Sequence, residues 1–139
     1  MNDRFNLSRF IEAQEGDYSD VLDELKRGKK AGHWIWYVFP QMASLGHSEM
    51  SEKYSISCIN EARAYIGHAI LGPRLVECTE LVLAVEGKTA EQIFGSLDAM
   101  KFRSSMTLFS HVSEADSIYQ HALSKYFDGE PDPKTLKAM

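Results

Sequence analysis

The segment PRLVECTELVLAVEG, residues 73–87, predicts the central element of the fold. Proline is tolerated at the first position of a helix and glycine commonly follows the last, so the pattern predicts a helix from Pro73 to about Glu86. Its residues of low polarity cover more than one face, which predicts that other helices surround it. They are Leu75, Val76, Cys78, Thr79, Leu81, Val82, Leu83 and Val85.

Helical signals also dominate on both sides of this segment. Two short N-terminal helices are predicted to end at Gly16 and Gly28, and another helix is predicted over Ile59–Ile66. Thr89–Gln92 has the form of a capping box, and a long helix is predicted over residues 97–109. Further helix starts and ends are predicted at Ser19, Gly95, Ser96, Ser113 with Asp116, Gly129, and Asp132 with Pro133. The sequence therefore predicts an all-α, compact multihelical single domain over residues 1–139.

Length and charge limit the classes of function. A chain of 139 residues has the usual size of one domain. Fifteen Lys and Arg against twenty Asp and Glu give a net charge of −5, so no general positive field attracts a phosphate backbone, and nucleic acid is not expected as a partner. We expect a cytoplasmic protein without membrane contact, because the N-terminal residues lack a secretion signal and the longest apolar run is too short to cross a bilayer.

The cysteines and histidines do not have the spacing of a metal site. Cys58 and Cys78 stand twenty positions apart without a second ligand beside either, and we expect both to be small core residues. None of the five histidines has a His or carboxylate partner in a known helical metal motif. No metal site and no cofactor are therefore predicted. The common hydrolase, nucleotide-triphosphatase and dinucleotide-binding signatures are missing from the sequence as well.

The run HWIWYVFPQ, residues 33–41, is the first candidate for a functional site. Its conformation is open between a helical turn and a buried strand, because a short apolar run does not separate the two, and we favour the helix. Trp34, Trp36 and Gln41 could contact a ligand, and His33 could act as a general acid or base. Residues 42–51 are predicted to form a loop with a tight turn at Gly46-His47-Ser48.

The run DAMKFRSSMTLF, residues 98–109, is the second candidate, since its polar residues are dense for a helix this apolar. Arg103 with Ser104, Ser105 and Thr107 is predicted to hold a phosphate or carboxylate group. Lys101 is predicted to contact the ligand as well, and Asp98 is a second candidate acid–base group. The alternative is structural: Asp98 and Lys101 pair one turn apart on the surface, and the hydroxyls bond back to helix carbonyls. Arg74, in the first turn of the Pro73 helix, needs either a carboxylate partner such as Asp98 or a bound anion.

Four strings in this order resemble a small, mainly bacterial domain family of unknown function that genome annotation often labels "calpastatin". They are residues 33–41, 62–68, 71–75 and 93–109, and the resemblance extends from Phe10 to Leu136. It implies a mainly α-helical fold and no particular activity. Protease inhibition is not expected, because the eukaryotic calpain inhibitor is disordered, whereas this chain has enough aromatic residues to form a hydrophobic core. Ile35 and Ser44 depart from the methionine and glycine usual in the family.

Two functions are compatible with these candidates. The first is the binding or processing of a small anionic, nucleotide-like metabolite in a pocket between the aromatic run and the Arg/Ser-rich helix. If the protein is an enzyme, hydrolysis of an N-glycosidic or phosphate-ester bond is expected. The second is a non-catalytic interaction module whose tryptophan-rich surface contacts a partner protein or another copy, as a homo-oligomer.

Overall fold

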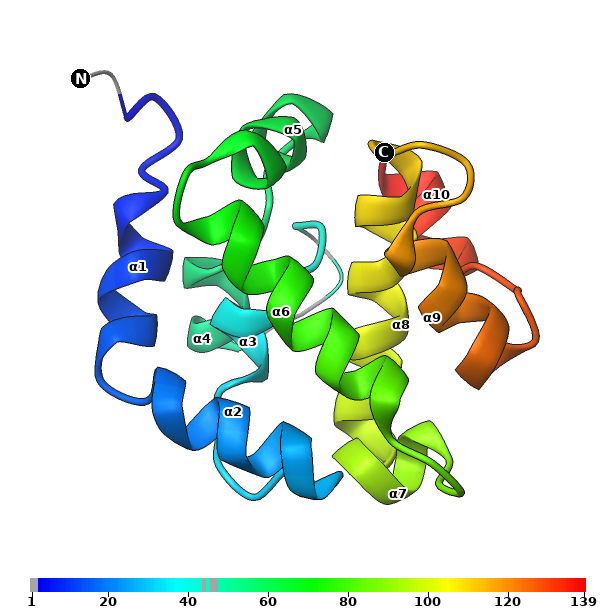
Figure 1. Ribbon diagram of the computed structural model, residues 1–139. Coiled ribbons are helices and arrows are strands. Elements are labelled where there is room, and N and C mark those ends of the chain that lie inside the picture. The colour runs from blue at the N-terminus through cyan, green and yellow to red at the C-terminus, as the bar shows by residue number, and fades with distance from the viewer. Residues whose placement is uncertain (1–2, 44, 46–47) are drawn as a thin grey trace.

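The computed structural model describes residues 3–43, 45 and 48–139. Within these ranges the chain forms ten helices and no strand, which confirms the all-α prediction (Figure 1). In chain order the helices are α1 (Ser8–Glu15), α2 (Tyr18–Arg27), α3 (Ile35–Val38), α4 (Glu49–Lys53), α5 (Ile59–Gly67), α6 (Leu71–Ala84), α7 (Ala90–Phe94), α8 (Ser96–His111), α9 (Ile118–Phe127) and α10 (Pro133–Ala138).

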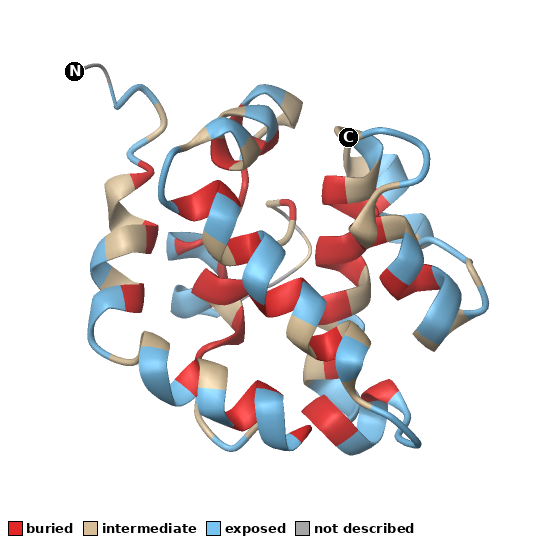
Figure 2. Ribbon diagram, viewed as in Figure 1, coloured by how far each residue is buried: buried red, intermediate tan, exposed pale blue. Residues whose placement is uncertain are grey.

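Helix α8, rather than α6, is the central helix. Half of its sixteen residues are buried, and it packs against α3, α5, α7, α9 and α10. Helix α6 contacts α2, α5 and α9, but it crosses the outside of the molecule in Figures 1 and 2. Its outer face exposes Val76, Glu77 and Glu80. The prediction of a surrounded helix was wrong because Leu81, Leu83 and Val85, at its end, are only partly buried.

Most of the predicted helix boundaries agree with the structure. Gly28, in the left-handed conformation, follows α2, and Thr89 forms the predicted capping box with Gln92. Gly72 is needed where α5 meets α6, because a Cβ there would lie 2.2 Å from the carbonyl oxygen of Ile66. That close approach lets α6 begin at Leu71, two residues before the predicted start.

Two predictions about the loops were wrong, and a third lies outside the described residues. Helix α4 occupies part of the loop predicted over residues 42–51, where Ser48 caps it by accepting from the Ser51 N–H. Helix α9 begins at Ile118 with Ser117 as its cap, instead of at Ser113. The turn predicted at residues 46–48 lies outside the described residues, Ser48 excepted.

The aromatic run forms the helical turn α3, as favoured from the sequence, and ties the first third of the chain to the last. Phe39 is 1% exposed and packs edge-on against Phe94 and Phe102, with ring centroids 6.1 and 4.9 Å apart. After Phe39 the chain runs alongside residue 56 through an isolated parallel bridge between Met42 and Ile56. In the described part of the chain, no helix combines the length and the apolar character that crossing a bilayer requires.

The two cysteines carry free thiols in different surroundings. Cys78 is buried in α6, as expected, and burial raises the pKa of its thiol to about 12, which keeps it protonated and unreactive. Cys58 is only partly buried and stands at the N-terminal boundary of α5, so the expectation of a core position was wrong for this residue.

Candidate functional site

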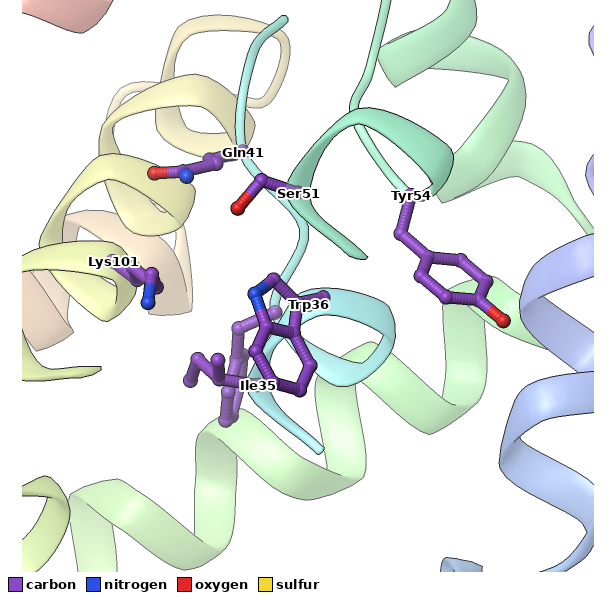
Figure 3. A pocket seen from close by; sticks show the side chains of 7 residues that line it. Ile35, Trp36, Gln41, Ser51, Tyr54 and Lys101 are labelled. Carbon is purple, nitrogen blue, oxygen red and sulfur yellow. The ribbon is translucent and has the colours of Figure 1, made fainter. Parts of the chain in front are cut away.

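A hollow lies between the end of the aromatic run and the outer face of α8. It has a volume of about 220 Å³ and is lined by Gln41, Leu45, Leu97, Met100, Lys101, Arg103, Ser104, Asp132 and Lys134. At its inner end is a notch of about 10 Å³, lined by Ile35, Trp36, Phe39, Gln41, Ser51, Tyr54 and Lys101 (Figure 3). Gln41 and Lys101 border both spaces. We therefore treat the hollow and the notch as one site.

Trp36 is the ring of the aromatic run that reaches this site. It is half-buried, and the Lys101 ammonium lies 5.7 Å from the centre of its ring, within the range of a cation–π contact. Figure 3 shows the indole nitrogen on the side of the ring that faces Gln41, Ser51 and Lys101. This Nε1 atom is buried and has no hydrogen-bond partner among residues 3–43, 45 and 48–139. Since a buried N–H is normally paired, this atom marks a place where a ligand would gain a hydrogen bond.

Asp98 and Lys30 hold Lys101 at the edge of the notch. The Asp98 carboxylate lies 2.6 Å from the Lys30 Nζ and 3.5 Å from the Lys101 Nζ. The Lys30 side chain is only 6% exposed, and its Nζ also donates to the carbonyl oxygen of Gly32. Lys30 is also close to the Glu24 carboxylate and to the Trp34 ring, so Lys101 is the cation of this cluster that lies beside Trp36.

The outer part of the site is apolar with a cationic rim. Leu97 and Met100 are 75% and 65% exposed, which is unusual for large apolar side chains in the middle of a domain. Lys101, Arg103 and Lys134 line the same hollow, and among its described lining residues Asp132 is the one carboxylate. The site is therefore locally positive on a chain whose net charge is −5.

The Arg/Ser-rich face of α8 is used largely by the chain itself. Arg103 donates to the carbonyl oxygens of Glu130 and Pro131 at 3.1 and 3.0 Å. The Ser104 hydroxyl lies 3.0 Å from the Asp132 carboxylate, and the Asp132 N–H donates to the Thr107 hydroxyl at 2.9 Å. Both hydroxyls also bond back to helix carbonyls, at Met100 and Arg103. These polar side chains of α8 thus attach the segment before α10 to α8. Their hydrogen bonds agree better with the structural alternative, in which they bond within the chain, than with a dedicated anion site.

The other residues proposed from the sequence lie away from the site. His33 is exposed and lines neither the hollow nor the notch. Arg74 is partnered by Gln14 and by the Glu15 carboxylate, at 3.2 and 3.4 Å, so its carboxylate partner is Glu15 rather than Asp98. Ser105 is fully buried, and its hydroxyl has no partner in the part of the chain that the structure describes. Of the predicted ligand-binding residues, the structure brings Trp36, Gln41, Lys101, Arg103 and Ser104 together.

Trp34 is a structural residue held by a buried glutamate. It is 1% exposed, and its Nε1 donates to the Glu24 carboxylate at 2.9 Å. The backbone N–H groups of Ala31 and Gly32 donate to the same oxygen at 2.7 and 2.9 Å. Burial alone would raise the pKa of Glu24, but these N–H donors and the nearby Lys30 outweigh it, and the pKa lies below its ordinary value. Glu24 therefore stays ionised and fixes the turn that leads into α3.

Several site residues were missed from the sequence. Met100 and Leu97 had a readable signal, because large apolar residues on the outer face of a predicted helix are exceptions to its amphipathic pattern. Ser51 and Lys134 had none, since they reach the site only through the positions of α4 and α10 in the folded chain.

Comparisons with known proteins give a family and a fold without an activity. The model of the family described as "Protein of unknown function (DUF1810)" matches residues 4–139. A crystal structure described as the conserved hypothetical protein Rv1873 from Mycobacterium tuberculosis is similar over 99% of this chain and 98% of its own, with 46% sequence identity and a TM-score of 0.97. The comparison with curated proteins gave no match.

Proposed function

Since this chain belongs to the DUF1810 family of proteins of unknown function, we propose a function from the geometry of its hollow: it binds a small anionic metabolite that carries a flat ring, as a nucleotide does. The observation that carries the proposal is the half-buried Trp36, whose indole N–H has no partner among the described residues and which lies with the Lys101 ammonium at the notch adjoining the open hollow.

The ring end of the ligand belongs at Trp36. Trp36 lines the notch, which meets the hollow at Gln41 and Lys101, so a planar ring held in the hollow comes edge-on to the indole N–H. Leu45 and Met100 supply apolar contacts on the outer side of the same hollow. A volume of about 220 Å³ suits one ring system with a short polar group, since pockets for drug-sized ligands start at roughly 300 Å³.

The anionic end belongs on the cationic rim. Lys101 and Lys134 are the cations best placed for it, because two N–H groups of Arg103 are already used by the carbonyl oxygens of residues 130 and 131. This changes the assignment made from the sequence, where Arg103, Ser104 and Ser105 held the anion. Arg103 and Ser104 still border the hollow and contribute to its shape and potential.

Binding is better supported than catalysis. His33 does not line the hollow, so the acid–base role considered for it has no geometric support. Asp98 is close to the site, but it accepts from Lys30 and Lys101 and therefore positions Lys101 rather than meeting the ligand. The rival function, a protein-interaction surface, no longer rests on Trp34; it is favoured only by the exposure of Leu97 and Met100.

A thermal-shift screen with nucleoside monophosphates, ADP-ribose and sugar phosphates tests the proposal. A ligand at 100 times its dissociation constant adds about 2.7 kcal/mol of stability, which corresponds to a rise in Tm of about 9 °C for a chain of this length. Lys101→Met should remove most of the shift. Lys26→Met, at an exposed position in the last turn of α2, is the matched control and should leave it unchanged.

Two results would contradict the proposal. One is that no compound of the panel raises Tm. The other is that Lys101→Met retains the full shift, which would place the binding elsewhere. If the panel fails and the protein self-associates through Leu97 and Met100, the interaction surface becomes the better account.

A further inference from the structure

The notch at the inner end of the hollow differs in its hydrogen-bonding character from the rest of the site. We propose that it receives a carbonyl oxygen on the ligand's ring, so that the protein prefers a base with an oxo group beside a ring N–H to one with an amino group beside a bare ring nitrogen. This inference rests on the proposed function and narrows its substrate class.

The notch is lined by hydrogen-bond donors. The Trp36 indole has an N–H and no acceptor, and the Lys101 ammonium likewise only donates. Ser51 adds a third donor, because its hydroxyl oxygen accepts from Ser48 at 3.0 Å and leaves its own hydrogen for another partner. All three residues, with Gln41, surround the notch in Figure 3. A ligand atom in the notch must therefore be a hydrogen-bond acceptor.

The size of the notch limits what that acceptor can be. A volume of about 10 Å³ is the room that one oxygen-sized group needs. A phosphate is too large for it, and an exocyclic amino group would point N–H bonds at the Trp36 N–H and the Lys101 ammonium, neither of which can accept. A ring carbonyl fits both conditions: it presents a single oxygen, in the plane of a ring that approaches the N–H edge of Trp36.

Gln41 completes the recognition of an oxo base. Its amide lies between the notch and the hollow and offers an acceptor oxygen as well as N–H donors. In oxo bases such as hypoxanthine and uracil, a ring N–H stands next to the carbonyl. The Gln41 oxygen can accept from that N–H while the carbonyl oxygen accepts from Trp36 and Lys101, whereas adenine and cytosine present a bare acceptor and an amino group at these positions.

Calorimetric titration with two pairs of nucleotides tests this inference. Inosine and adenosine monophosphates share sugar and phosphate and differ only at the edge in question, and uridine and cytidine monophosphates repeat the comparison on a smaller ring. We expect the oxo member of each pair to bind at least about tenfold more tightly, the effect of one buried hydrogen bond gained or lost. Trp36→Phe keeps an aromatic ring and removes the N–H, so it should reduce the ratio of the two affinities within each pair, which a general loss of binding would leave unchanged.

A second variant keeps the test independent of Trp36. Gln41 lies outside the helices, and Gln41→Leu should likewise reduce the ratio of the two affinities within each pair. Equal affinities within each pair, or tighter binding of the amino nucleotides, would overturn the inference and leave the proposed function standing. If none of the four nucleotides binds, the inference is overturned, and the proposed function is overturned with it only if ADP-ribose and the sugar phosphates also fail to bind.

Discussion

Removing the carboxylate of Glu24 should destabilise the protein strongly although the residue lies outside the hollow. Its Oε1 accepts from the N–H groups of Ala31, Gly32 and Trp34 at 2.7 to 2.9 Å. Glu24→Ala leaves these three donors without an acceptor. A buried donor left unpaired costs roughly 1 to 3 kcal/mol, and because the truncated side chain lets some water in, we take the lower value for each. The expected loss is therefore about 3 kcal/mol.

Urea denaturation followed by tryptophan fluorescence measures this loss. With an m-value of about 2 kcal/mol per molar, the midpoint should fall by about 1.5 M. Asp23→Ala removes an exposed carboxylate from the neighbouring position and should change the stability by less than about 0.5 kcal/mol. A loss below 1 kcal/mol for Glu24→Ala, or an equal loss for Asp23→Ala, would show that the glutamate does not hold the turn before α3.

Three further predictions concern pH, a helix junction and the C-terminal helix. Since the pKa of Glu24 is lowered on folding, its charge stabilises the protein above the ordinary carboxyl pKa, and this stabilisation is lost as pH falls through the lower pKa of the folded state. The difference in stability between the wild type and Glu24→Gln should therefore shrink below about pH 4. A difference that grows below this pH would contradict the prediction. Gly72→Ala should lower Tm by several degrees, because the added Cβ would lie 2.2 Å from the Ile66 carbonyl oxygen. Gly67→Ala, with no atom within 4 Å of its Cβ, should leave Tm nearly unchanged. Equal Tm values for the two variants would refute the close approach. Asp132→Ala removes the cap of α10 and the hydrogen bond to Ser104, so the backbone amides of α10 should exchange their hydrogens about ten times faster. Glu130→Ala, at an exposed neighbouring position, should leave the exchange rate unchanged. Slow exchange in both variants would mean that the cap does not stabilise α10.

The fold was predictable from the sequence because its signals are local. Helix caps such as Thr89 and helix-ending glycines such as Gly28 act within a few residues, and so does the apolar periodicity. The position of the central helix was not predictable in this way. The buried fraction of α8 depends on which helices surround it, and Phe102 meets Phe39 across more than sixty residues of chain.

The site was predictable only in part, for the same reason. Trp36 and Lys101 were both candidates, and their approach to 5.7 Å follows from the packing of α3 against α8. The sequence could not separate Trp34 from Trp36, because the partner that buries Trp34 is Glu24 in another helix. Nor could it show that the acceptors for Arg103 and Ser104 are residues 130–132 of the same chain.

The two indole N–H groups give a direct measurement of the central claim, that Trp36 and Lys101 form a ligand site. The chain has two tryptophans, so the indole region of a ¹H–¹⁵N correlation spectrum contains two signals, and Trp36→Phe assigns them. Titration with inosine monophosphate should move the Trp36 signal in a saturable way, because its N–H gains a partner, and should leave the Trp34 signal, already bonded to Glu24, almost in place. A saturable shift confined to Trp34, or two signals that do not move with any nucleotide or sugar phosphate, would contradict the account.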